Sequence, residues 1–230
     1  KASTENIWDL CPDRYGNLWV GTWGSHLYKV RLSGSFSDIY ELEDIQDDSH
    51  APAHIVQSPD GRLWISTKTK EVFEISKEDK KPRRLKLPPG QETGNRRHAP
   101  PMAYNSDTLW IGIYNGLLAY LPATKTTHFF PLETTNKDLE GDWINTIAYN
   151  SSSIWCGTLF GCIYRFDLNK KSFEAFHEEK TNLGIVGDIE ILTNGHILAG
   201  TSKGIHYVNP EDNRKKFYQQ FAGALDLHQD

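Results

Sequence analysis

The feature of this sequence that most constrains its fold is a short motif that recurs five times at a nearly constant spacing. Each copy is centred on one anchor residue, and four of the five anchors are tryptophan. The anchors are Trp19, Trp64, Trp110, Trp155 and Leu198, which lie 45, 46, 45 and 43 residues apart. Repeats of this length form one structural unit each, and neighbouring units bury each other's apolar faces.

The signals around each anchor predict strands rather than helices. The motif reads Asn-Leu-Trp-Val-Gly-Thr at the first anchor and His-Ile-Leu-Ala-Gly-Thr, its weakest copy, at the last. A short apolar run and a turn rich in Asp, Asn, Ser and Gly precede each copy, and two further short runs follow it. Four short strands joined by tight turns in every repeat of ~45 residues are typical of a β-propeller blade.

We therefore predict an all-β chain, a single β-propeller segment over residues 1–230 with about five four-stranded antiparallel blades. The blades are expected at approximately 5–45, 52–90, 100–135, 143–180 and 187–222, with fourth strands at 38–42, 83–87, 128–132, 173–177 and 216–221. Helices should be nearly absent because no segment has an apolar period of 3.6 residues. The anchors should pack between blades, and the Gly two residues after the anchor should permit close approach of the next sheet.

The last residues bear on whether the propeller is complete. Ala224 to Asp230 align with Ile7 to Asp13, so we expect residues 223–230 to be the first strand of a following blade. The chain is then expected to be an incomplete, fragmentary propeller, although an unusual closed ring of five blades stays open as an alternative. An open array exposes an apolar face at each end, which predicts self-association through those faces.

Composition excludes several classes of protein. Lys and Arg total 25 against 30 Asp and Glu, a net charge of −5, so no nucleic-acid partner is expected. No apolar run approaches the ~18 residues that span a bilayer. The three cysteines, Cys11, Cys156 and Cys162, are too few for a disulfide scaffold, and the redox state of Cys156 and Cys162 stays open.

The segment Ile7 to Lys29, with echoes at 55–74, 144–165 and 189–207, resembles the two-component regulator propeller repeat. In that repeat an Ile-rich strand, an Asp-Gly turn, Leu-Trp-Ile-Gly-Thr and Gly-Leu-Tyr follow in order. The resemblance covers essentially the whole chain, although Ser66 replaces Gly, Ile113 replaces Thr, and the fifth repeat lacks Trp. The WD40 signature of Gly-His and Trp-Asp does not recur.

The resemblance implies a periplasmic sensor domain, as in the hybrid two-component sensor kinases of Bacteroidetes, which respond to glycan fragments. The kinase and its phosphorelay would lie outside this chain, in a membrane-spanning parent that also supplies further propeller blades. On this interpretation the chain itself is not an enzyme, has no catalytic residues, and uses no cofactor or metal. An oligosaccharide is the expected ligand.

Candidate ligand-binding residues come from the second turn of each blade and the connections between blades. The turns offer aromatic residues at nearly the same repeat position, and the connections add basic residues, the aromatic Trp143 and the acidic Asp142 beside it. The candidates are Trp23, Tyr114, Phe160, Arg96, Arg97, His98 and Trp143. Aromatic rings stack on the apolar faces of sugars, whereas Arg donates to hydroxyls and carboxylates.

Two alternatives to the sensor hypothesis stay open. A carbohydrate-active enzyme built on a five-bladed propeller would need two carboxylates facing one pocket, and the repeated turns do not display such a pair. A protein–protein interaction scaffold would use the same face, and the sequence separates it poorly from a saccharide sensor.

Overall fold

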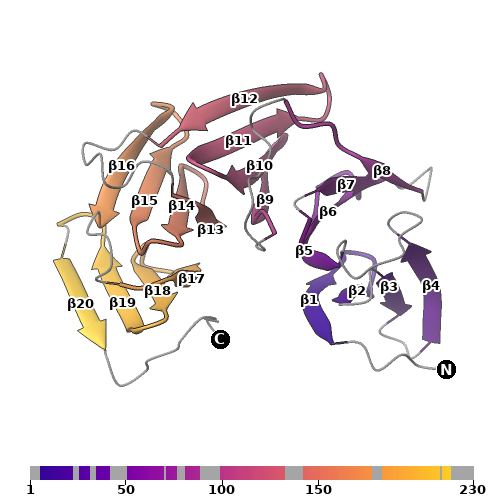
Figure 1. Cartoon of the computed structure of the whole chain (residues 1–230), viewed down its shortest axis with the longest axis horizontal. Helices are drawn as coiled ribbons and strands as arrows, with labels where there is room; N and C mark the ends of the chain where they lie inside the picture. Colours follow the sequence, from indigo (N-terminus) through magenta and orange to yellow (C-terminus); the bar gives the residue numbers. More distant parts are fainter. Residues whose placement is uncertain are drawn as a thin grey trace. The chain divides into compact units, whose positions relative to one another are not determined.

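The chain was analysed as a computed structural model that describes residues 6–22, 26–31, 35–41, 51–69, 71–76, 81–88, 99–132, 142–177, 183–212 and 214–218. These residues form five antiparallel sheets of four strands each and contain no helix (Figure 1). The predicted all-β class and the four-stranded blades are therefore confirmed. The described part of the chain contains no helix of the length and hydropathy needed to cross a membrane.

Within each sheet the strands follow one another in sequence order, as hairpins. The first sheet comprises β1 (Ile7–Pro12), β2 (Asn17–Thr22), β3 (His26–Arg31) and β4 (Ser35–Glu41). The second comprises β5 (Pro52–Gln57), β6 (Leu63–Thr67), β7 (Val72–Ile75) and β8 (Pro82–Arg84). The third comprises β9 (Met102–Asn105), β10 (Thr108–Ile113), β11 (Gly116–Leu121) and β12 (Thr126–Pro131).

The fourth sheet comprises β13 (Ile144–Tyr149), β14 (Ser153–Thr158), β15 (Ile163–Asp167) and β16 (Ser172–His177). The fifth comprises β17 (Val186–Ile191), β18 (Ile197–Thr201), β19 (Gly204–Asn209) and β20 (Arg214–Tyr218). The chain divides into two compact units, Lys1–Asp107 and Thr108–Asp230, and the boundary falls in the turn between β9 and β10.

The outer strands differ most from the sequence prediction. Strand β8 ends at Arg84 rather than at residue 87, because its partner β7 is short. The N–H of Leu85 still donates to the carbonyl of Val72, the first residue of β7, at 2.7 Å, so β7 offers no residue that could pair with 86 or 87. The predicted end of the last outer strand, 219–221, and the predicted strand 223–230 lie outside the described residues.

The turn before the first anchor shows why an aspartate recurs there. Asp13 accepts hydrogen bonds from the backbone N–H groups of Tyr15 and Asn17, at 2.8 and 2.9 Å. Its other oxygen accepts from the Asn17 side chain and, at 3.1 Å, from the indole Nε1 of Trp19. One carboxylate therefore caps the turn and orients the anchor ring, which is the role that Asx turns give to aspartate.

The innermost strands share a bulge that the sequence pattern did not reveal. In four sheets the pairing of the first and second strands shifts at the first residues, between Ile7 and Asp9, Pro52 and His54, Ile144 and Thr146, and Val186 and Asp188. A bulge adds one residue to one strand and re-aims the side chains beside it. Its recurrence at one repeat position makes it a feature of the blade.

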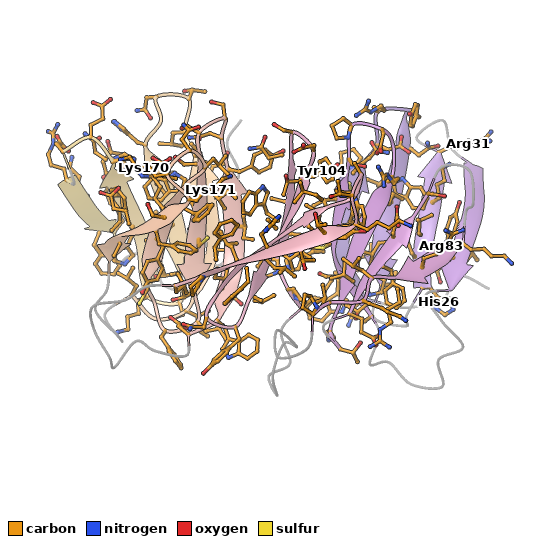
Figure 2. All side chains as sticks on the ribbon, turned by 90° about the horizontal axis from the view of Figure 1, so that it is seen from above. His26, Arg31, Arg83, Tyr104, Lys170 and Lys171 are labelled. Atoms are coloured by element: carbon orange, nitrogen blue, oxygen red, sulfur yellow. The ribbon has the colours of Figure 1, made fainter. Side chains whose placement is uncertain are left out.

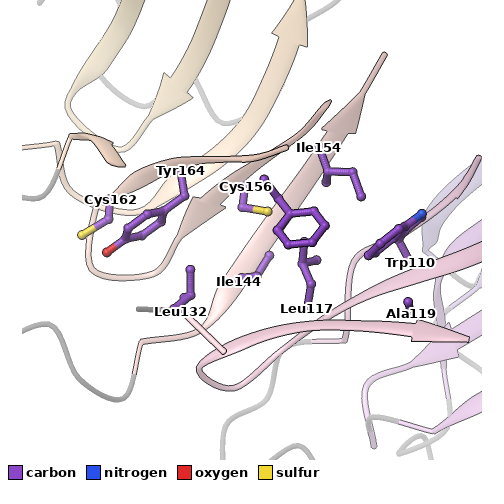
Figure 3. Close-up of a cluster of buried hydrophobic side chains, with 10 residues drawn as sticks. Trp110, Leu117, Ala119, Leu132, Ile144, Ile154, Cys156, Cys162 and Tyr164 are labelled. Atoms are coloured by element: carbon purple, nitrogen blue, oxygen red, sulfur yellow. The ribbon is translucent and has the colours of Figure 1, made fainter. Parts of the chain in front are cut away.

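Three clusters of buried apolar side chains join neighbouring sheets. The first and second sheets share Trp19, Leu27, Tyr40, Ile55, Leu63, Ile65, Phe73 and Ile75. The third and fourth share Trp110, Leu117, Ala119, Leu132, Ile144, Ile154, Cys156, Cys162, Tyr164 and Phe166 (Figure 3). The fourth and fifth share Trp155, Ile163, Phe176, Leu183, Val186, Ile189, Ile197, Ala199 and Val208.

All five anchors lie on the second strand of their sheets, and Trp19, Trp110 and Trp155 occupy the same position in these three interfaces. The four tryptophans are buried, whereas Leu198 is half-buried. A basic side chain lies over each tryptophan ring: Lys29 over Trp19, Arg62 over Trp64, Lys171 over Trp110 and Arg165 over Trp155, between 5.4 and 6.0 Å from the ring centroid. Each tryptophan anchor therefore combines a large buried apolar area with a cation–π contact.

The residue two places after the anchor controls how closely neighbouring sheets approach. A Cβ on Gly21 would lie 3.0 Å from the Cβ and the carbonyl oxygen of Pro52, at the start of the next sheet. In the second sheet Ser66 stands at this position, and its hydroxyl donates to the carbonyl of Pro100 at 2.7 Å. The departure from Gly is thus compensated by a buried hydrogen bond.

The two cysteines whose redox state the sequence left open are free thiols in the structure. Cys156 and Cys162 are both buried in the cluster between the third and fourth sheets (Figure 3). Burial raises the pKa of the Cys156 thiol above its usual range, so the side chain is a neutral apolar residue at this position.

Two titratable groups lie on adjacent innermost strands of the first unit. The carboxylate of Asp9 in β1 accepts the N–H of Ile55 in β5 at 2.7 Å and the N–H of Leu10 at 2.8 Å. Burial nevertheless raises the pKa of Asp9 to about 6, since desolvation outweighs these two hydrogen bonds. Burial lowers the pKa of His54 from 6.5 to about 4.

These opposite shifts predict opposite pH dependences of stability. Between pH 4 and 6 native Asp9 keeps a proton that the unfolded chain has released, so its contribution to the free energy of unfolding falls as pH rises. Between pH 4 and 6.5 unfolded His54 binds a proton that the native state excludes, so its contribution rises. Relative to the wild type, Asp9→Asn should therefore gain stability as pH rises, and His54→Gln should lose it. Urea unfolding at a series of pH values measures both differences, and three parallel curves would contradict the assignment.

Candidate functional site

Three of the predicted aromatic residues lie on segments that hydrogen bonds join at one edge of the second unit. Tyr114 follows β10, Trp143 precedes β13, and Phe160 lies in the turn between β14 and β15. Tyr114 and Trp143 form an isolated antiparallel bridge, and their ring centroids are 4.9 Å apart with the planes inclined at 49°. We call Tyr114, Trp143 and Phe160 the aromatic platform. Lys170 and Lys171 (labelled in Figure 2) lie in the turn after β15, whereas Phe160 lies in the turn before it.

A buried carboxylate holds the platform together. Asp142 is fully buried, and its Oδ1 accepts the N–H groups of Trp143 at 2.7 Å and Phe160 at 3.2 Å. The main-chain oxygen of Trp143 accepts the N–H of Leu159 at 3.0 Å. Because one side chain bonds to the backbone of two separate segments, the connection before β13 and the turn after β14 are held in fixed positions.

The backbone at Asn115 brings Tyr114 to this carboxylate. Asn115 has a φ of 57°, in the left-handed region that Asn tolerates better than most residues. Its N–H donates to the main-chain oxygen of Asp142 at 2.8 Å, and its own carbonyl accepts the N–H of Leu132 at 2.8 Å. The following Gly116 must lack a side chain, since a Cβ there would lie 2.2 Å from the carbonyl oxygen of Phe130. The Asn-Gly pair therefore positions Tyr114 against Trp143.

The platform is accessible to a ligand. Tyr114 is 46% exposed, although large apolar and aromatic residues nearby are buried. Trp143 and Phe160 are half-buried. An exposed aromatic ring that is braced by a second ring and a buried hydrogen-bond network is a preorganised stacking surface. It loses little conformational entropy when a flat apolar group binds.

The remaining predicted site residues cannot be compared with the platform from the described part of the chain. Trp23 and the run Arg96, Arg97 and His98 lie outside the described residues, so their roles stay predictions. Sequence reasoning did not single out Asn115 as a site residue, although the Asn-Gly pair at 115–116 is a signal for the turn that shapes the site.

A second exposed aromatic residue was also missed. Trp8 in the first unit is exposed, and the Nζ atom of Lys68 lies 3.9 Å from its ring centroid. The sequence assigned no function to Trp8 because it stands in the apolar run of the innermost strand. Its partner Lys68 follows β6, 60 positions along the chain, so no local pattern could link the two residues.

The chemistry that the platform offers is binding. Acid–base cleavage of a glycosidic bond needs two positioned carboxyl groups, whereas the described residues that hold the platform supply one, Asp142, whose Oδ1 already accepts two amides. Within the described ranges no group of three or more His, Cys, Asp or Glu side chains is arranged to hold a metal ion.

Comparison at the level of sequence identifies the first repeat. Residues 2–24 match the model of the family described as two component regulator propeller. These residues include the innermost strand, the Asp13 turn and the first anchor, Trp19, which are the features on which the resemblance rests. No curated protein matches the chain.

Comparison with solved structures shows the propeller fold over almost the whole chain. The extracellular domain assigned to a hybrid two component system of B. thetaiotaomicron superposes with a TM-score of 0.70 at 20% identity, over 93% of this chain and 30% of that one. The extracellular domain assigned to a one component system of the same organism gives a TM-score of 0.60 at 14% identity, over 94% of this chain and 33% of that one. The chain thus spans about a third of the length of these structures.

A structure of the WD40 repeats of RRP9 is equally similar in shape. It gives a TM-score of 0.70 at 14% identity, over 94% of this chain and 63% of that one. At such identities the likeness establishes blade architecture, and propeller blades carry many unrelated functions. The family model matches residues 2–24, and the superpositions by themselves show the propeller fold alone.

Proposed function

We propose that this chain, whose first repeat is a two component regulator propeller repeat, is part of the extracytoplasmic sensor of a hybrid two-component system. We further propose that its aromatic platform binds a saccharide. The family match at residues 2–24 and the superposition on extracellular domains of B. thetaiotaomicron support the first statement. The exposed ring of Tyr114, braced by Trp143, carries the second.

The geometry favours a saccharide because pyranose rings have one or more apolar C–H faces that stack on aromatic side chains. The C–H face of a sugar would lie on Tyr114, and its hydroxyls would reach the polar backbone groups at the edge of the platform. The kinase that reads this event, and its phosphorelay, belong to the parent protein beyond these residues.

The test is a thermal-shift and calorimetric screen of the full chain against neutral and acidic oligosaccharides. A ligand that binds only the native state raises the apparent stability in proportion to its occupancy. A saccharide that raises the melting temperature and is recovered intact supports the proposal. A saccharide that is cleaved during the assay would establish the enzyme instead, and a stabilising protein partner in the absence of any active saccharide would establish the scaffold.

Replacing Tyr114 with alanine should weaken the binding of any saccharide found in this screen by about tenfold or more, because the stacking surface is removed. The exposed side chain contributes little to stability, so the melting temperature without ligand should change little. Phe217→Ala removes an equally exposed aromatic ring from β20 and serves as the control. Equal affinities of the wild type and Tyr114→Ala would remove the platform from the binding site while leaving the sensor assignment untouched.

A further inference from the structure

The connection that leads into the fifth sheet carries an exposed apolar side chain. Ile185 stands one residue before β17, at the repeat position that Trp143 occupies before β13, and β13 and β17 are the innermost strands of neighbouring sheets in the second unit (Figure 1). Ile185 is 41% exposed, close to the value for Tyr114 on the platform. A single exposed apolar residue is ordinary in a protein, so the significance of Ile185 depends on what holds it and what lies beside it.

The internal repeat gives Ile185 the same backbone support as Trp143. The N–H of Leu159 donates to the main-chain oxygen of Trp143, and the N–H of Ser202 donates to that of Ile185, both at 3.0 Å. Leu159 and Ser202 each lie four residues after the anchor of their sheet. Ser202 adds a second bond, since its Oγ accepts the N–H of Ile185 at 3.1 Å. Ile185 is therefore held at both of its backbone groups, and little conformational entropy is lost when a ligand covers it.

Two glycines bring the segment of Ile185 against the platform. Gly161 follows Phe160, and a Cβ on Gly161 would lie 2.5 Å from the main-chain oxygen of Gly184, the residue before Ile185. Gly161 and Gly184 have φ values of 85° and 71°, in the left-handed region that glycine adopts most readily. The turn that carries Phe160 and the connection that carries Ile185 therefore meet backbone to backbone, with no side chain on either of the two residues that touch.

We propose that Ile185 is a second subsite for the saccharide that the aromatic platform binds, so that the ligand is a chain of at least two sugar rings. This inference rests on the proposed function of the platform. One ring would lie on Tyr114, and a later ring of the same chain would place its apolar C–H face on Ile185. The fourth and fifth sheets pack face to face, and such sheets lie about 10 Å apart, which is more than one sugar ring spans.

Polar groups beside Ile185 favour a saccharide chain over an apolar ligand of the same length. The main chain at Gly184 is half-buried, and the hydroxyl of Ser202, which accepts the N–H of Ile185, has its own proton to donate to a sugar oxygen. A saccharide carries hydroxyls between its apolar C–H faces and would pair with both groups. A purely apolar ligand would displace water from these groups without replacing the lost hydrogen bonds, which costs free energy.

Calorimetric titration of the full chain with saccharides of increasing length tests the subsite. The probes are β-1,4-linked chains of one to four rings, in separate series of glucose, xylose and mannose. In the series that binds, the affinity should rise about tenfold or more between one and three rings, because the apolar area of Ile185 is then buried, and should change little with the fourth ring. Ile185→Ala should remove most of this gain and leave the affinity for the single ring unchanged. Tyr114→Ala should weaken the binding of every length.

Ile39→Ala is the matched control, because Ile39 on β4 is also exposed and the same atoms are removed. This variant should bind every length like the wild type, and circular dichroism checks that all variants keep the fold. Binding that depends on Tyr114 but does not change with chain length, or a gain with length that Ile185→Ala leaves intact, would overturn the subsite and keep the proposed function. Equal losses in Ile185→Ala and Ile39→Ala would also overturn it. Absence of binding in all three series would overturn the proposed function together with the subsite.

Discussion

Replacing Trp155 with alanine should lower the free energy of unfolding by about 3–5 kcal/mol, the range observed when a large buried aromatic side chain is removed. Trp155 is buried at the interface of the fourth and fifth sheets, and its ring centroid lies 4.7 Å from that of Phe176. The guanidinium of Arg165 lies over both rings, at 5.9 and 5.3 Å. The substitution therefore leaves a cavity and removes two contacts of the remaining side chains.

Leu198→Ala is the matched control because Leu198 occupies the same repeat position in the fifth sheet but is half-buried. Leu198→Ala should lower the free energy of unfolding much less than Trp155→Ala does. Leu198 buries less area, and surrounding water can fill the space that its side chain leaves. Urea unfolding followed by far-ultraviolet circular dichroism measures both values without depending on tryptophan emission. Equal losses for the two variants would contradict the role of the anchor tryptophan in joining sheets.

The period of the repeat made the fold predictable, because it fixes the number of blades and the strand on which each anchor lies. The ends of the outer strands were less predictable, since they depend on the length of the partner strand. Strand β8 stops at Arg84 because β7 begins at Val72, and nothing within residues 83–87 signals that limit. The bulge at Asp9 and His54 was also hidden, because an inserted residue does not change the apolar pattern around it.

The sequence predicted individual residues of the candidate site, but it did not predict how they are arranged in space. The repeat position marked Tyr114 and Phe160 as aromatic turn residues, and Trp143 stood out in a connection between blades. That Tyr114 and Trp143 pack against each other depends on Asn115 and on the carboxylate of Asp142, which also accepts the N–H of Phe160, 18 residues further along the chain. Such long-range hydrogen bonds follow from the packed fold and leave no periodic signal in the sequence.

Replacing Gly157 with alanine should also be strongly destabilising, although it adds a single methyl group. A Cβ at this position would lie 2.3 Å from Cγ1 of Val186 and 2.8 Å from Cγ2 of Thr146, both of which are buried. Val186 lies at the start of the fifth sheet, so the clash would separate two sheets that are packed along their length. Overpacking of a well-packed interior costs about 1–3 kcal/mol, and the value here should lie at the upper end of that range.

Two comparison variants test whether the loss of stability comes from the close approach of the two sheets. Gly21→Ala adds the same methyl group at the same repeat position, where the nearest atoms of Pro52 are 3.0 Å away, so its loss should be smaller. Adding Val186→Ala to Gly157→Ala removes the closest clashing atom, so the double variant should be more stable than the sum of the single losses predicts. Strict additivity, or equal losses at Gly21 and Gly157, would show that the glycine acts through backbone freedom instead. Because Ser66 occupies this position in the second sheet with a hydrogen bond to Pro100, the repeat tolerates a side chain only where the next sheet offers space and an acceptor.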